Sequence, residues 1–236
     1  MEEAKATGTT FENLGVLDLI EMKPDDLAAV TLIQNVGVII APEALSGTLL
    51  KIPQKNVGLT VTIPTTSGKI KRLTGQLAMD GEAFANRTGS PDDILVVAGQ
   101  VIITSGIETV GFKEVIVSGQ VIAPKKTEQT LMGAVSRFNG QMVYYNGETP
   151  RLFVGDDTFS KAFFDYFDDR FSMVLVGDFV FDSDVDTATL KQKVEEVVLI
   201  GNLKAPKQLV PLLQHLAVVK LGSIAGIENA AAASEQ

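Results

Sequence analysis

The sequence predicts an α/β repeat solenoid, in which parallel strands stack with a right-handed crossover in rungs of about 21 residues. A short motif that runs from glycine to Ala-Pro occupies residues 37–42, and it returns 82 residues later at 119–124 and again at 201–206. Eleven glycines that follow or interrupt apolar runs also recur about every 21 residues. A fixed period of this kind indicates units that bury their apolar faces against one another. The eleven glycines are Gly15, Gly37, Gly58, Gly75, Gly99, Gly119, Gly140, Gly155, Gly177, Gly201 and Gly222.

The apolar runs before the repeated motifs predict parallel strands. Residues 28–40 are a nearly continuous series of valine, isoleucine and leucine, which suits a strand that is covered on both faces. The proline of each motif suits the first position of a short helix, where its missing N–H removes no hydrogen bond. We therefore expect structural roles for six positions: Gly37, Pro42, Gly119, Pro124, Gly201 and Pro206. A right-handed parallel β-helix is the alternative fold.

The remaining segments complete the predicted rungs. Residues 83–86 and 162–166 suggest short helices, and residues 63–70 and 145–150 suggest turns between strands. We expect a mobile arm at residues 1–10, a single solenoid domain at 11–227 and a loose tail at 228–236. The three copies within the domain are expected at roughly 11–92, 93–170 and 171–227.

Part of the pattern resembles the leucine-rich-repeat family. Two stretches match most of its consensus, and a third matches until glutamine stands where asparagine is expected. The resemblance implies a scaffold that binds other macromolecules on a strand-lined face. The matching residues are Leu27, Val30, Leu32 and Asn35; Val194, Val197, Leu199 and Asn202; and Phe112, Val115, Val117 and Gln120.

Composition argues against several function classes. The net charge of −9 opposes binding to nucleic acid or to an anionic membrane surface. The chain has no cysteine, so it predicts neither disulfides nor thiolate metal ligands. No apolar run approaches 18 residues, and residues 1–5 do not resemble the start of a signal peptide. We therefore expect a cytoplasmic protein.

The sequence offers little for catalysis. His215 is the only histidine, so histidine-pair zinc sites are excluded and histidine-based nucleophilic catalysis has a single candidate residue. Neither of the glycine-rich nucleotide-binding motifs occurs. We expect a protein without a cofactor that is not an enzyme.

The stretch 156–186 supports an alternative, because it holds nine aspartates. Asp182, Asp184 and Asp186 have the spacing of a calcium loop, but Thr187 and Lys193 occupy the positions where such a loop needs glycine and glutamate. The three aspartates remain candidates for another divalent-cation site. Paired carboxylates also suit a carbohydrate-active enzyme or a carbohydrate-binding protein.

The same region, counted from residue 153, holds nine of the chain's fifteen aromatic residues. Helical spacing places some of them in a core, whereas an exposed aromatic patch rimmed by aspartate is typical of a partner site. The interaction candidates are Phe163, Phe164, Tyr166, Phe167, Asp168 and Asp169.

The two ends of the predicted stack lack polar caps. The first rung, 11–20, and the last, 216–224, are as apolar as the internal rungs. Open strand edges and uncapped apolar rungs favour association with further chains. The sequence therefore predicts a structural or protein-interaction scaffold that binds its own copy or another protein, as a homodimer or as a filament through its ends.

Overall fold

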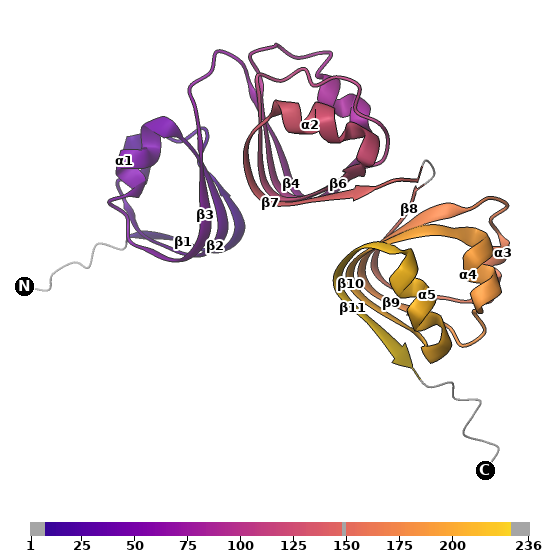
Figure 1. Cartoon of the computed structure of the whole chain (residues 1–236). Coiled ribbons are helices and arrows are strands. Elements are labelled where there is room, and N and C mark those ends of the chain that lie inside the picture. Colours follow the sequence, from indigo (N-terminus) through magenta and orange to yellow (C-terminus); the bar gives the residue numbers. More distant parts are fainter. Residues whose placement is uncertain (1–7, 148–149, 228–236) are drawn as a thin grey trace, which may run out of the picture.

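The computed structural model describes residues 8–147 and 150–227, and within these ranges the chain alternates between strands and short helices (Figure 1). The predicted tail and most of the predicted arm lie outside the described residues. All strand pairs are parallel, and the strands form three sheets. Sheet A contains β1 (Thr9–Asp18), β2 (Val30–Pro42) and β3 (Gln54–Ile63). Sheet B contains β4 (Ile70–Met79), β5 (Ile94–Ile103), β6 (Glu114–Pro124) and β7 (Val135–Tyr145). Sheet C contains β8 (Pro150–Phe159), β9 (Phe171–Phe181), β10 (Val194–Pro206) and β11 (Ala217–Ile227).

Short helices connect the strands. Sheet A has the 3-10 helices η1 (Pro24–Leu27) and η2 (Glu43–Leu45) and the helix α1 (Ser46–Leu49). Sheet B has η3 (Gly81–Ala85), η4 (Lys125–Thr127) and α2 (Glu128–Ala134). Sheet C has α3 (Lys161–Asp165), α4 (Thr187–Lys193), η5 (Lys207–Leu209) and α5 (Val210–Leu216). The short helices expected near 83–86 and 162–166 are therefore confirmed.

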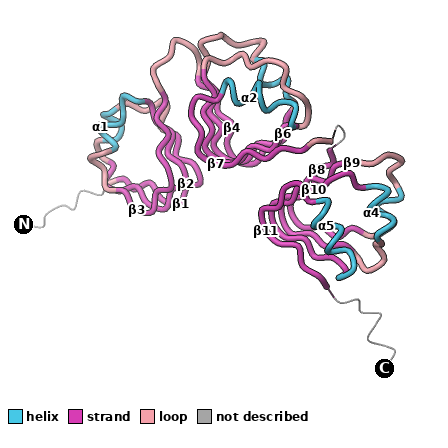
Figure 2. The backbone as a smooth tube through the Cα atoms, viewed as in Figure 1, coloured by secondary structure: helices cyan, strands magenta, loops and turns pink. Residues whose placement is uncertain are grey.

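The strands do not continue through one sheet, as a single parallel spine would require. The ladder stops between β3 and β4 and again between β7 and β8, at the two segments predicted as turns. The breaks after residues 63 and 145 do not coincide with the expected copy boundaries near 92 and 170. Mostly parallel β-structure is confirmed, and it is divided into three sheets (Figure 2).

The eleven predicted glycines occupy equivalent places in the eleven described strands. In sheet B, Gly75, Gly99, Gly119 and Gly140 pair in register, and sheet C has the same arrangement. Gly119 shows why glycine is needed: its φ is +147°, and a Cβ atom there would lie 2.0 Å from the carbonyl oxygen of Gly99. Neighbouring strands therefore approach one another more closely than a side chain would allow.

The 82-residue motif marks the next-to-last strand of each sheet. Gly37, Gly119 and Gly201 lie in β2, β6 and β10, and each strand leads through a short 3-10 and α-helical segment into the last strand. The prolines end these strands and cap the helices, one residue before the position that we predicted. Pro42, for example, has the extended angles φ −62° and ψ 147°. By this alignment β1 corresponds to β5 and β9, so β4 and β8 have no counterpart among the described strands of sheet A.

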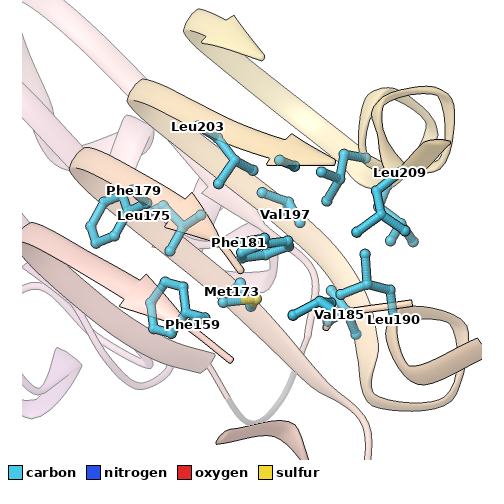
Figure 3. Close-up of a cluster of buried hydrophobic side chains, with 14 of the residues drawn as sticks. Phe159, Met173, Leu175, Phe179, Phe181, Val185, Leu190, Val197, Leu203 and Leu209 are labelled. Carbon is cyan, nitrogen blue, oxygen red and sulfur yellow. The ribbon is translucent and has the colours of Figure 1, made fainter. Parts of the chain in front are cut away.

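Each sheet bends along its strands, and its concave inner face holds a core that the short helices close (Figure 1). Leu45 and Leu49 cover the core of sheet A, and Leu131 covers that of sheet B. In sheet C, Leu190 and Leu209 close a core rich in phenylalanine (Figure 3). The helices cover only the inner faces, so the apolar residues of the convex outer faces need other parts of the chain to bury them.

The outer faces join the three sheets into an arc (Figure 1). Before the bend in sheet B, Ile94 and Val96 form an apolar cluster with Ile40 and Ile63 of sheet A. After the bend, Ile102 and Ile122 form another cluster with Val174 and Val198 of sheet C. The bend thus turns two halves of one outer face toward two different neighbours.

Among the described residues, no helix has both the length and the apolar character to span a membrane.

Candidate functional site

The predicted aromatic patch is largely a core. Phe164 is buried, and its ring packs edge-to-face against Phe181 with the centroids 5.6 Å apart. Phe163 and Phe167 are half-buried and pack against the same cluster. The structure therefore assigns three of the six interaction candidates to the interior of sheet C.

The other three candidates are exposed in and after the C-terminal turn of α3. Tyr166 is 87% exposed, and Asp168 and Asp169 follow it at the surface. Tyr166 stands beside aspartates, as predicted, but it is one aromatic ring and not a patch. The backbone carbonyl of Phe167, between Tyr166 and Asp168, accepts a hydrogen bond from the side chain of Lys193. This bond ties the loop to α4.

The three cation candidates are bonded to protein groups, and two of them, Asp184 and Asp186, share Lys161. Asp186 caps α4 by accepting a hydrogen bond from the backbone N–H of Thr189 at 2.8 Å, and it pairs with Lys161 Nζ at 2.6 Å. The Lys161 ammonium and the Thr189 N–H lower the pKa of Asp186 to about 2. Asp184 accepts from the backbone N–H of Lys161, and Asp182 accepts from that of Ser183. Within residues 8–147 and 150–227, no group of three or more acidic or histidine side chains has a metal-binding arrangement.

Two buried carboxylates stabilise loops. Glu196 accepts hydrogen bonds from both nitrogens of Asn146 and from the N–H of Gly147, and so holds the turn between sheets B and C. Asp93 accepts from the backbone N–H of Lys69 at 2.7 Å. That N–H, with the Asn86 amide, lowers the pKa of Asp93. His215 is exposed in the last turn of α5, away from both carboxylate sites in the sequence.

Polar side chains form ladders along the outer bends of the sheets. In sheet B, the residue after each glycine is glutamine, and Gln76, Gln100, Gln120 and Gln141 bond one to the next. In sheet A the ladder is made by Asn13, Asn35 and Asn56, and all three have positive φ. The sequence contains the signal for the sheet B ladder in four Gly-Gln pairs, and this ladder is absent from the predictions above.

Sheet C carries a third ladder beside a shallow hollow. Asn202 donates to Asp178 at 2.7 Å, and Ser223 donates to Asn202 at 2.7 Å. These residues and Lys204 line a hollow of about 280 Å³ on the outer face. Asp178 is the only carboxylate among the described residues that line it, so these residues do not supply the carboxylate pair that glycoside hydrolysis requires.

The strand stacks end in open edges. Within the described residues, each of the first strands β1, β4 and β8 and of the last strands β3, β7 and β11 has one strand neighbour. Arg72 of β4 pairs with Asp18 of β1 at 2.7 Å, and Arg137 of β7 donates to the Thr62 carbonyl of β3 at 2.6 Å. Strand β7 also lies against β11, and the cluster between sheets B and C joins β5 and β6 with β9 and β10. The three stacks therefore run in the same direction.

This arrangement gathers the six edges at two opposite ends of the molecule. We name the end with β1, β4 and β8 the leading end, and the end with β3, β7 and β11 the trailing end. The charged residues of the trailing strands are all basic: Lys55, Arg137 and Lys220. The leading strands carry four acids and three bases: Glu12, Asp18, Asp156 and Asp157, with Lys71, Arg72 and Arg151.

Comparison of the chain with protein-family models, with curated proteins and with solved structures found no match. The leucine-rich-repeat resemblance is therefore one of sequence pattern alone. Its two asparagines occupy different ladders, since Asn35 lies two residues before Gly37 and Asn202 directly follows Gly201.

Proposed function

We propose that the protein is a non-catalytic structural scaffold that binds copies of itself or another protein through the ends of its strand stacks. The observation that carries this proposal is the gathering of six open strand edges at two ends. An open edge presents unpaired N–H and C=O groups to another strand. The apolar side chains of the first and last strands also favour binding. In sheet B, for example, the half-buried Met79, Met142 and Tyr144 flank the core at its two ends.

We further propose that the three sheets are segments of one right-handed α/β solenoid. The aligned glycines, the parallel ladders and the repeated strand-to-helix connections support this proposal. A right-handed crossover is the strong general preference for parallel neighbours. A cytoplasmic location is part of the same proposal and rests on the sequence alone.

The carbohydrate or cation alternative has weaker support. Its aspartates at 182, 184 and 186 already bond to protein groups, two of them to Lys161, and the described residues that line the outer hollow of sheet C include one carboxylate. A polysaccharide-binding screen with Asp184→Asn as control would favour this alternative if binding were found and then lost in the variant.

Light scattering of the 236-residue chain tests the scaffold proposal in its self-binding form. We expect a mass above the 25.2 kDa of one chain that rises with concentration. Val218 is 49% exposed on the edge strand β11, so Val218→Lys is expected to reduce the mass. Leu50→Lys is the control, because Leu50 is 85% exposed after α1 and outside the strands. A monomer at every concentration would refute self-association.

A further inference from the structure

We propose that the trailing end of one copy binds the leading end of the next, so that sheets B and C continue from copy to copy. This inference rests on the self-association proposed above, and it adds which surfaces meet and in which order. Placing β7 beside β4 of the next copy, and β11 beside β8, repeats the strand pairing that each sheet already contains.

The glutamine ladder of sheet B has complementary ends. Gln76 donates its amide to Gln100, so its own carbonyl oxygen receives no bond from the described ladder. At the other end, Gln141 accepts from Gln120 at 2.9 Å, and its amide nitrogen has no ladder partner. If β7 pairs with the next β4 in the same register, Gly140 meets Gly75 and Gln141 can donate to Gln76. The ladder then continues in one direction across the junction.

The leading edge of sheet B has space for such a strand. Gly119 has the carbonyl oxygen of Gly99 where its Cβ would be, whereas Gly75 has a φ of +83° and no atom within 4 Å of that place. Gly155 on the leading edge of sheet C is equally open, with a φ of +104°. Both glycines thus allow the close backbone approach that the inner strands use.

Sheet C has opposite charges on its two edges, and both belong to inward-facing positions. Lys220 lies on β11 in register with the buried Leu199, and Asp157 lies on β8 in register with the buried Phe179. Lys220 lies two residues before Gly222, and Asp157 lies two residues after Gly155. Residues at these two offsets share a core in sheet B, as Val97 and Val101 show. Stacking therefore directs Lys220 of one copy and Asp157 of the next into the same concave face, where they can form an ion pair.

The proposed junction of sheet B brings two arginines together. The shared register places Arg137 beside Arg72 of the next copy. Arg72 already faces two carboxylates, Asp18 at 2.7 Å and Glu21 at 3.7 Å. This group has a net negative charge, so a second guanidinium is attracted to it and not repelled.

Sheet A does not take part in strand pairing. Four strands set a repeat of about 19 Å in sheets B and C. Sheet A has three strands, so β3 and the next β1 remain about 10 Å apart. Lys55 and Glu12 share a register across that space, and their opposite charges add to the attraction.

Inward-pointing charges have another known use, since they protect edge strands from unwanted pairing. The two explanations predict opposite effects of removing a charge. If Lys220 only protects its edge, the neutral Lys220→Met chain associates more strongly. If Lys220 forms the junction, the same chain associates less strongly.

Charge exchange tests the junction by sedimentation equilibrium of the full chain. We expect Lys220→Glu and Asp157→Lys each to weaken association by at least about tenfold, because like charges then meet. The double variant is expected to restore association, since the pair returns in reversed order. Lys191→Glu is the control, because it makes the same charge change on the exposed face of α4. Circular dichroism confirms that each variant is folded.

The outcomes separate this inference from the scaffold proposal. A wild-type chain that is always a monomer overturns the stacking and also the self-binding form of the scaffold proposal. A wild-type chain that associates, with no effect of either charge reversal or no restoration in the double variant, overturns the stacking alone. Stronger association of Lys220→Met also overturns it. Filaments of the wild-type chain, where they form, are expected to show an axial repeat of about 19 Å in electron micrographs.

Discussion

Replacing Gly119 by alanine tests the physical basis of the strand stacking. The new Cβ would lie 2.0 Å from the carbonyl oxygen of Gly99 and 2.8 Å from its nitrogen, both of which are backbone atoms. The residue would also keep a φ of +147°, which side-chain-bearing residues rarely adopt. Backbone strain of this kind costs about 1–3 kcal/mol, and overpacking costs about 1–3 kcal/mol. We therefore expect Gly119→Ala to lower the free energy of unfolding by about 2–6 kcal/mol.

Urea unfolding followed by circular dichroism measures this loss, and Gly15→Ala is the matched control. Gly15 occupies the equivalent place in β1, but its φ is not positive and no atom lies within 4 Å of its would-be Cβ. We expect a change near zero, or a gain of up to about 1 kcal/mol from the less flexible unfolded chain. Equal losses in the two variants would refute the argument that close backbone approach requires the glycines.

Two further predictions concern carboxylates. Glu196→Gln replaces an acceptor of several hydrogen bonds, so we expect urea unfolding to show a free energy of unfolding lower by about 1.5–3 kcal/mol for each bond broken. The matched control is Glu195→Gln at an exposed position, which we expect to change this free energy little. Similar values for the two variants would contradict the role of Glu196. Asp186 has a pKa of about 2, below its unfolded value of about 4, so its stabilising effect is complete above pH 4 and is lost as the pH falls toward 2. An NMR carboxyl titration with a midpoint near 4 would show that this pairing with Lys161 is absent in solution.

The sequence predicted the strand positions because the glycines report a backbone requirement directly. A residue such as Gly99 must admit the next strand whatever the side chains around it, so the period of about 21 residues survives in the sequence. The same holds for the prolines, which end β2, β6 and β10, although their offset from the helices was wrong by one residue. Short-range conformational demands of this kind are readable without knowing the tertiary packing.

The division into three sheets was not predicted, because packing between sheets has no distinct sequence signal here. Val96 and Val97 are adjacent and both buried, yet one packs against sheet A and the other lies in the core of sheet B. An apolar residue does not indicate which of two apolar surfaces it meets. The aromatic stretch was ambiguous for the same reason, and only the structure separates the buried Phe164 from the exposed Tyr166.

The distribution of polar residues explains why the arc contains three sheets and why the proposed association runs along the stacks. Beyond its bend, the outer face of sheet C presents Asp178, Asn202 and Lys204 to solvent, so no fourth sheet has an apolar surface to pack on. The corresponding free face of sheet A begins with Glu12, which accepts a hydrogen bond from Gln34 at 2.6 Å. Lateral growth is therefore unfavourable at both sides, because these polar groups would lose water without gaining partners. The strand edges at the leading and trailing ends differ from these outer faces. When an edge loses water on association, the strand of the next copy supplies the hydrogen bonds that water made.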